Sequence, residues 1–261
     1  MRGRKIIAIS VALIIALCSC SVKEDRSPCP CYLTFDLSGC GNVSDSLTIS
    51  AFGEMSLFKE SISTNDYPTF YEKTVKKGIV TTSVLCGYGK DAEKNGQIIS
   101  TKGEDALPLW GYSSSINCTG ELARDSVVLG RQSARIHLKV ESIDGNPYPY
   151  QLVAKSDICG LEMQDLSPVK GDYSYSLFLD SEAVCTFRLY RQTPESRATI
   201  EVLERGILIE TLPLYAWIEA TGYDWSDSDL KDIYIGMDYA RANVTITIQD
   251  WSAEEAIHIT I

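Results

Sequence analysis

The residue best placed for chemistry is Cys20, which follows Leu17-Cys18-Ser19. A large aliphatic residue stands three positions before it and a small residue stands immediately before it. This order is typical of a site where the chain is cut before a cysteine whose thiol then receives a lipid. Cys18 is the poorer acceptor, because bulky Leu17 would stand immediately before the cut. The resemblance of these residues to a bacterial lipobox implies cleavage between Ser19 and Cys20 and lipid attachment at Cys20.

The segment before Cys20 has the layout of a secretory signal. Arg2, Arg4 and Lys5 form a basic start, and residues 6–17 are apolar except for Ser10. This run is shorter than the ~20 residues that span a membrane as a helix. Its end resembles a bacterial lipobox. We therefore expect residues 1–19 to be a signal peptide and residues 20–31 to be a lipidated N-terminus and tether outside the cytoplasm.

The charge of the chain excludes some partners. The 261 residues carry a formal net charge of −11, and residues 1–19 hold three positive charges and no acidic ones, so cleavage changes the net charge to −14. A surface this acidic does not attract nucleic acid or an anionic bilayer. The sequence predicts no nucleic-acid partner and membrane contact only through the N-terminal lipid, at ~0.8 kcal/mol per buried methylene.

Seven of the nine cysteines remain once Cys18 is removed and Cys20 is lipidated. An exported location permits disulfides, but an odd number leaves at least one thiol unpaired within the chain. Cys29-Pro30-Cys31 is too closely spaced to pair without strain and lacks the spacing of a zinc or redox site. Burial as small apolar residues is the favoured interpretation for most of them. Bonds from Cys29 or Cys31 to Cys40, or between Cys86 and Cys118, stay open.

The sequence contains little that could form a catalytic site. It has two histidines, and His137 lies between Arg135 and Lys139, whose charges disfavour its protonated form. No GxSxG, HExxH or GxGxxG motif occurs, and the acidic run 224–232 lacks the glycine and final glutamate of an EF-hand loop. The sequence predicts a non-enzymatic protein with no catalytic residue, cofactor or metal.

Apolar residues recur with a period of two, which is typical of half-buried strands. Leu33, Phe35 and Leu37 alternate with polar neighbours, residues 134–140 alternate throughout, and Glu204-Arg205-Gly206 separates two further candidate strands. Helices are expected to be short at most, around residues 45–59 or 226–233. Many short strands divided by turn residues predict an all-β protein built of β-sandwiches.

Residues 142–150 contain Gly, Asn and two prolines, and a regular strand cannot continue through them. We therefore expect an N-terminal β-sandwich over residues 32–145 and a C-terminal one over residues 146–261.

Aromatic residues two positions apart share a face of a strand and form either a glycan platform or ordinary core. Core is the favoured interpretation. The pairs are Trp110 with Tyr112, Tyr148 with Tyr150, Tyr173 with Tyr175, and Tyr215 with Trp217.

Several segments, in order, resemble the fimbrial anchor lipoproteins of the Mfa/FimB type. They are the start Cys20 to Leu37 with its Cys-Pro pair, Leu107-Pro-Leu-Trp-Gly111, Leu129 to Val140, Asp232 to Tyr239, and Val244 to Trp251. The resemblance implies two tandem transthyretin-like (Greek-key) β-sandwich domains and a role in rooting a type V fimbria in the outer membrane. In that system shaft subunits lose their first strand after cleavage at an arginine, and the next subunit fills the groove. Anchors keep the first strand.

The positions of the arginines agree with retention of the first strand. No arginine occurs from Ser27 to Ala123, so Arg26 precedes the first strand and Arg124 lies far beyond it. A cut at either position cannot remove that strand alone, while cleavage at Lys59 by a lysine-directed protease stays open. We therefore predict that the segment carrying Leu33, Phe35 and Leu37 fills its own groove.

The C-terminal tail carries two alternating apolar runs and needs an unpaired sheet edge. It either pairs within its own domain, which is the favoured interpretation, or donates a strand to a fimbrial shaft subunit. The candidate partner residues are Val244, Ile246, Ile248, Ile257, Ile259 and Ile261. The sequence thus predicts a surface-exposed, outer-membrane lipoprotein that anchors a fimbria or regulates its assembly. A glycan- or ligand-binding surface lipoprotein and a fimbrial tip adhesin are the alternatives.

Overall fold

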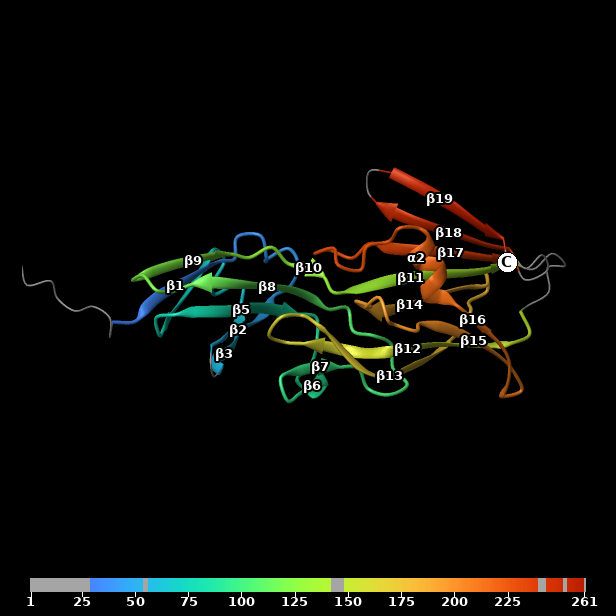
Figure 1. Cartoon of the computed structure of the whole chain (residues 1–261), viewed down its shortest axis with the longest axis horizontal. Coiled ribbons are helices and arrows are strands. Elements are labelled where there is room, and N and C mark those ends of the chain that lie inside the picture. Colours follow the sequence, from blue (N-terminus) through green and yellow to red (C-terminus); the bar gives the residue numbers. More distant parts are fainter. Residues whose placement is uncertain (1–28, 54–55, 142–147, 239–242, 251–252, 261) are drawn as a thin grey trace, which may run out of the picture.

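The computed structural model describes residues 29–53, 56–141, 148–238, 243–250 and 253–260 (Figure 1). Strands dominate, as the period-two patterns predict, and the expected all-β class is confirmed. Two separate hydrophobic cores lie one after the other along an elongated molecule. In Figure 1 some strands, such as β8 and β12, run close to the long axis, whereas β18 and β19 slope across it.

The first core lies between a sheet of three strands, in the order β4-β1-β9, and a sheet of five, in the order β10-β8-β5-β2-β3. Leu33 and Phe35 from one sheet and Leu47, Ile49 and Val84 from the other are completely buried there. The strands are β1 (Cys31–Asp36), β2 (Ser46–Phe52), β3 (Ser56–Ser63), β4 (Phe70–Val75), β5 (Ile79–Cys86), β8 (Trp110–Asn117), β9 (Leu122–Ser126) and β10 (Gly130–Arg131).

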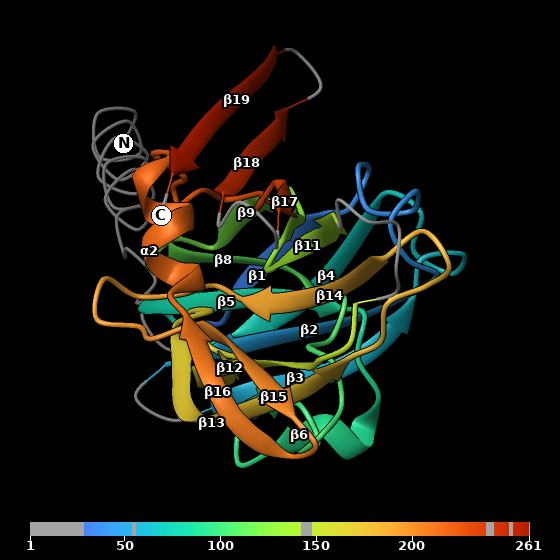
Figure 2. The same cartoon turned by 90° about the vertical axis from the view of Figure 1, so that its right-hand side faces the viewer.

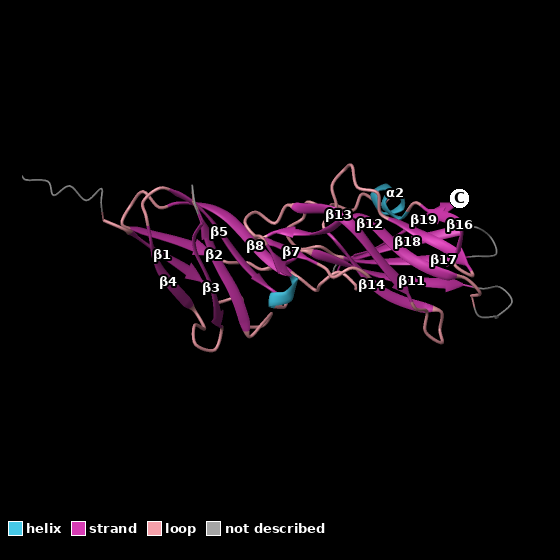
Figure 3. Cartoon of the chain, turned by 90° about the horizontal axis from the view of Figure 1, so that it is seen from below, coloured by secondary structure: helices cyan, strands magenta, loops and turns pink. Residues whose placement is uncertain are grey.

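The second core lies between the sheet β14-β11-β17-β18-β19 and a six-stranded sheet in the order β16-β15-β12-β7-β6, in which β13 also pairs with β12. Its strands are β6 (Glu93–Lys94), β7 (Gln97–Ile99), β11 (Ser133–Glu141), β12 (Gln151–Glu162), β13 (Pro168–Leu177), β14 (Val184–Tyr190), β15 (Thr199–Glu204), β16 (Ile207–Leu212), β17 (Asp232–Asp238), β18 (Asn243–Asp250) and β19 (Ala253–Thr260). Figure 3 shows these layers from below.

Helices are few in the described part of the chain. A single 3₁₀ turn, η2 (Lys90–Ala92), precedes β6, and α2 (Leu214–Ala220) follows Pro213. Leu214, Trp217 and Ile218 are spaced so that one face of α2 packs on the second core. Among the described residues no helix is long and apolar enough to span a membrane.

The predicted boundary between residues 145 and 146 differs from the division between the two cores. β11 precedes that boundary, yet it pairs with β14 and β17 and buries Ile136 and Leu138 in the second core. β7 likewise pairs with the end of β12. The ranges 32–145 and 146–261 are therefore corrected. The segment 142–150, with its two prolines, stands between β11 and β12, which both belong to the second core. The chain passes from the first core to the second near Leu129 and Gly130, where the sequence has no such proline-rich segment.

Neither segment expected to form a helix does so. Residues 45–59 form most of the β2–β3 hairpin, and residues 226–233 form turns and the start of β17. In β2 the apolar residues Leu47, Ile49 and Ala51 recur every second position and face the core, a period that suits a strand rather than a helix.

Candidate functional site

The first strand is an internal part of the first core. All six residues of β1 pair antiparallel with β4, and five of them pair parallel with β9. The side chains of Leu33 and Phe35, and of Leu37 just beyond the strand, are fully buried. β1 is therefore a central strand of its sheet, paired on both sides and buried in the first core.

An ion pair closes the end of β1. Arg124 of β9 donates a hydrogen bond from Nη2 to Asp36 Oδ2 at 2.6 Å, and this bond, with smaller help from Ser38, lowers the pKa of the Asp36 carboxyl. Backbone bonds continue past the strand, from Leu37 N to Thr69 O at 2.7 Å and from Val127 N to Asp36 O at 3.1 Å. Sequence reasoning used Arg124 only as a cleavage position and missed this pairing.

The arginine positions can be placed only in part. Arg124 lies within β9 opposite Thr34 of β1, so cleavage there would cut through the sheet. Arg26 and the predicted processing residues Ser19 and Cys20 lie outside the described residues.

The C-terminal strands extend one sheet of the second core. β18 pairs with β17, and β19 pairs with β18, so the terminal strand lies within its own sheet. The register aligns Val244, Ile246 and Ile248 with Met237, Ile235 and Ile233 of β17, which are buried. It also aligns Ile257 with Ile246 and Ile259 with Val244. The register therefore aligns the predicted partner positions with one another or with positions of β17, except Ile261, which lies outside the described residues.

The far side of β19 is a sheet edge. No strand in the described part of the chain pairs with that side. Viewed along the long axis, β18 and β19 extend away from the layer formed by β12, β13, β15 and β16 (Figure 2). An edge of this kind offers free N–H and C=O groups to a partner strand.

A network of polar contacts joins the two cores. Gln132 is 2% exposed, and its side-chain amide donates to the carbonyl oxygens of Gly111 in β8 at 3.2 Å and of Ser228, before β17, at 3.3 Å. Arg191 donates to the Gln132 side-chain oxygen at 2.9 Å and to Trp225 O at 2.5 Å. One buried side chain thus links a strand of the first core to a loop of the second.

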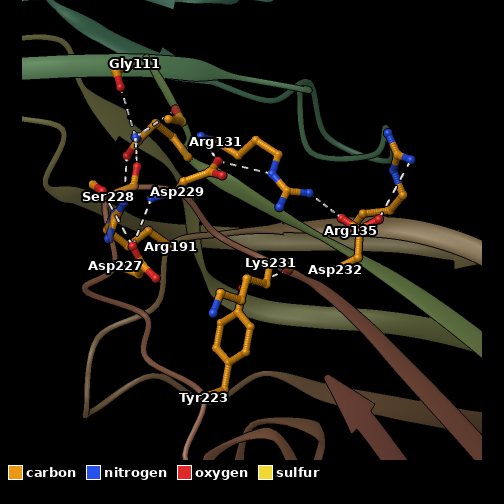
Figure 4. Close-up of polar contacts among 12 residues, drawn as sticks. Gly111, Arg131, Arg135, Arg191, Tyr223, Asp227, Ser228, Asp229, Lys231 and Asp232 are labelled. Carbon is orange, nitrogen blue, oxygen red and sulfur yellow. Dashed lines mark hydrogen bonds and ion pairs between the residues drawn. The ribbon is translucent and has the colours of Figure 1, made fainter. Parts of the chain in front are cut away.

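Arg131 strengthens the same junction (Figure 4). Its backbone N–H donates to Asp229 Oδ1 at 2.8 Å, and its Nη1 donates to Asp232 Oδ1 at 2.6 Å. The chains approach closely here, since a Cβ added at Gly130 would lie 1.9 Å from Ser228 O. Nothing in the sequence indicates this junction, because its partners are about a hundred positions apart.

His137 does not form a catalytic constellation. Its ring stacks on Tyr234 with centroids 4.4 Å apart, its Nδ1 lies 3.2 Å from Thr186 Oγ1, and its Nε2 lies 3.5 Å from Asp232 Oδ2. Asp232 is already bound by Arg131. Within the described ranges, no group of three or more His, Cys, Asp or Glu side chains could hold a metal ion.

The paired aromatic residues belong to the cores. Tyr173 and Trp217 are buried, and the other six are partly buried and pack on one core or the other. The most exposed aromatic residues on the sheet that holds β1 are Tyr32 and Phe70. Tyr32 lies near the start of β1, and Phe70 of β4 lies opposite Asp36 at the end of β1. These residues do not form a continuous exposed aromatic platform.

Known structures share this architecture, although no family model and no curated protein matches the chain in sequence. The fimbrial anchor protein Mfa2 from Porphyromonas gingivalis is 14% identical, with a TM-score of 0.57 over 88% of this chain and 99% of Mfa2. The chain has the fold of a fimbrial anchor protein. The resemblance to the Mfa/FimB type is thus supported by a fold shared over most of both chains.

Two further structures are similar over nearly their whole length. A candidate polysaccharide-binding protein from Bacteroides thetaiotaomicron is 13% identical, with a TM-score of 0.61 over 89% of this chain and 98% of that chain. A candidate adhesin from Bacteroides ovatus is 10% identical, with a TM-score of 0.55 over 91% of this chain and 98% of that chain. At these identities the likeness concerns the fold.

Proposed function

We propose that this protein is a surface-exposed, outer-membrane lipoprotein that anchors a fimbria or regulates its assembly. The observation that carries the proposal is β1, which is paired on both sides and buried in its own sandwich. A sandwich in this state has no groove to accept a strand from another subunit. It suits the end of a polymer, where no further subunit inserts on that side.

The opposite end of the protein supplies the contact. β19 is an edge strand, and the register places Ile257 and Ile259 in line with apolar residues of β18 and β17. Strand addition at an edge takes its affinity from backbone hydrogen bonds and its specificity from alternating side chains. In this proposal a fimbrial shaft subunit engages β18 and β19, while the lipid on Cys20 holds the other end in the membrane.

The first experiment removes the lipid acceptor. With Cys20→Ser, we expect fimbriae to be released into the medium, since the fibre loses its membrane attachment. Cys18→Ser is the matched control, because its residue is discarded with the signal peptide. Fibres that remain on the cells with Cys20→Ser would contradict an anchoring role, and labelling at the distal end of the fibre would indicate a tip adhesin instead.

The second experiment tests the C-terminal strands. Capture of fimbriae should be lost on deletion of residues 243–261 and on the double substitution Ile257→Lys and Ile259→Lys. His258→Lys with Thr260→Lys is the matched control, since these residues alternate with the isoleucines along the same strand. Equal capture by all variants would refute the strand contact while leaving lipid anchoring in place.

A glycan-binding function has less structural support. The neighbour from Bacteroides thetaiotaomicron is a candidate polysaccharide-binding protein, but in this chain the paired aromatic residues pack on the cores. Glycan-array binding by the purified protein, unaffected by the β19 substitutions, would favour this alternative.

A further inference from the structure

Two cysteines meet at the start of the first strand. Cys31 is the first residue of β1, and Cys118 is the first residue after β8. Both are completely buried in the first core as free thiols, and the Cys31 thiol is near enough to contribute to the raised pKa of the Cys118 thiol. β1 and β8 belong to different sheets, and Cys31 and Cys118 lie in the one hydrophobic core between these sheets.

The backbone holds both cysteines in place. Tyr32 N donates to Glu121 O at 2.8 Å, which fixes the start of β1 against the segment that connects β8 to β9. Cys118 N donates to Gly78 O at 2.8 Å, and Cys31 lies opposite Val75 of β4. These backbone contacts therefore fix the positions of both cysteines in the first core.

We propose that Cys31 and Cys118 form a disulfide in the exported protein and that this bond staples the retained first strand to the opposite sheet. Two S–H bonds break and one S–S bond forms. Two protons are released, and the two electrons reduce the disulfide of a thiol–disulfide oxidase of the cell envelope. The proposal rests on the proposed export, because cytosolic thiols are kept reduced.

The burial of the thiols indicates at which stage of folding the disulfide would form. Burial, with smaller contributions from the neighbouring Cys31 thiol and from Asp125, raises the pKa of the Cys118 thiol to about 11. The thiolate is the species that attacks a disulfide, so the folded protein reacts slowly. Oxidation therefore belongs to the stage of folding before β1 is fully enclosed.

The bond would close a loop of 88 residues, from Cys31 to Cys118. A cross-link of this kind restricts the unfolded chain. It also keeps β1 attached if the chain is cut within that loop or if the ion pair between Asp36 and Arg124 opens. Retention of the first strand then becomes covalent.

The other described cysteines serve as comparisons. Cys29 is exposed and two positions from Cys31, which makes it the nearest competitor. Cys185 is buried in the second core and provides a matched buried control.

The test maps the thiols of the full-length protein taken from the envelope fraction of a bacterium that exports it. The protein is denatured without reductant in N-ethylmaleimide and digested with trypsin and chymotrypsin, which cut on either side of the segment ending at Tyr32. We expect that segment to be joined to the peptide containing Cys118, with five of the seven described thiols alkylated. Alkylation of both Cys31 and Cys118, or a bond from either one to another cysteine, would overturn the proposal.

Variants separate a covalent bond from a packing contact. Cys31→Ala and Cys118→Ala should each abolish the cross-link, whereas Cys29→Ala and Cys185→Ala should preserve it. Reductant should lower the unfolding midpoint of the wild-type protein and have no effect on that of Cys31→Ala. An equal response of both proteins to reductant would contradict the bond even if the alanine variant is less stable.

The outcomes also separate this inference from the proposed function. Free thiols in a protein that is lipidated and in the envelope refute only the disulfide. A protein absent from the envelope fraction refutes both proposals.

Discussion

The first and last strands of this protein are held very differently. β1 pairs with a neighbour on each side and buries every second residue. Among the described strands, β19 pairs with β18 alone and forms the edge of its sheet. Both segments show the same alternation of apolar residues, so the pattern that predicts a strand does not decide whether the strand lies inside a sheet or at its edge.

This difference gives the molecule one closed end and one open end. Extracting β1 would break two ladders and empty the centre of a core, whereas separating β19 from β18 breaks one ladder. If the protein binds a fimbrial polymer by strand addition, the edge formed by β19 can accept a strand with less rearrangement than the position filled by β1. The predictions below test this contrast, from the largest expected effect to the smallest.

Truncating a core residue of β1 should cause the largest loss of stability. Phe35→Ala should lower the free energy of unfolding by about 3–5 kcal/mol, because a fully buried aromatic side chain leaves a cavity. Thr34→Ala, at the adjacent half-buried position, should change it by about 0.5 kcal/mol or less. Denaturant unfolding of the two variants provides the measurement, and equal losses would show that β1 is not integral to the core.

Hydrogen exchange compares the two strands directly. Amides of β1 should exchange only on global unfolding, while those of β19 should exchange through local opening, at rates higher by roughly a hundredfold or more. Mass-spectrometric exchange on peptic peptides from the two segments measures this ratio. Equal protection would mean that β19 is held as firmly as β1 and is not an open end.

Removing Gln132 tests whether the two ends act as one body. Gln132→Ala leaves the carbonyls of Gly111 and Ser228 without this donor and Arg191 without this acceptor. A cost of about 1–3 kcal/mol is expected for each buried group left unpaired. Calorimetry should show the single transition of the wild type dividing into two. Gly41→Ala, where an added Cβ meets nothing within 4 Å, is the control that should keep one transition.

A pH titration tests the ion pair at the end of β1 and should give the smallest effect. Arg124 lowers the pKa of Asp36 below its ordinary value of 3.8. The folded-state pKa lies below the unfolded-state value, so the stabilisation is present above about pH 4 and is lost as the pH falls through the folded-state pKa. Asp36→Asn should lose stability less steeply than the wild type in this acidic window. Parallel curves for the two proteins would exclude a contribution from the pair.

The strands themselves were largely predictable from the sequence, because alternation reports burial on one face of a sheet. Residues 134–140 lie in β11 with Ala134, Ile136, Leu138 and Val140 buried. The turn expected at Glu204-Arg205-Gly206 joins β15 to β16, with positive φ at Arg205 and Gly206. A strand with one buried face and a tight turn depend on neighbouring residues, so both can be predicted from a short stretch of sequence.

Features that depend on distant partners were not predictable. α2 was missed because its Leu214, Trp217 and Ile218 pattern spans only seven residues, too short for a sustained helical period. The contact of Cys31 with Cys118 and the junction around Gln132 join residues brought together only by the fold. For the candidate site, the sequence predicted a buried first strand and an alternating tail, and the structure added their neighbours and the register that aligns them.

The polar junction between the cores has a mechanical consequence. The two cores lie one after the other along the molecule, so tension applied at β19 and resisted at the start of β1 would pass from one core to the other (Figure 1). The bonds of Gln132, Arg131 and Arg191 form the crossing between the two halves. The strength of the molecule under a pull would then be set at this crossing rather than inside either sandwich.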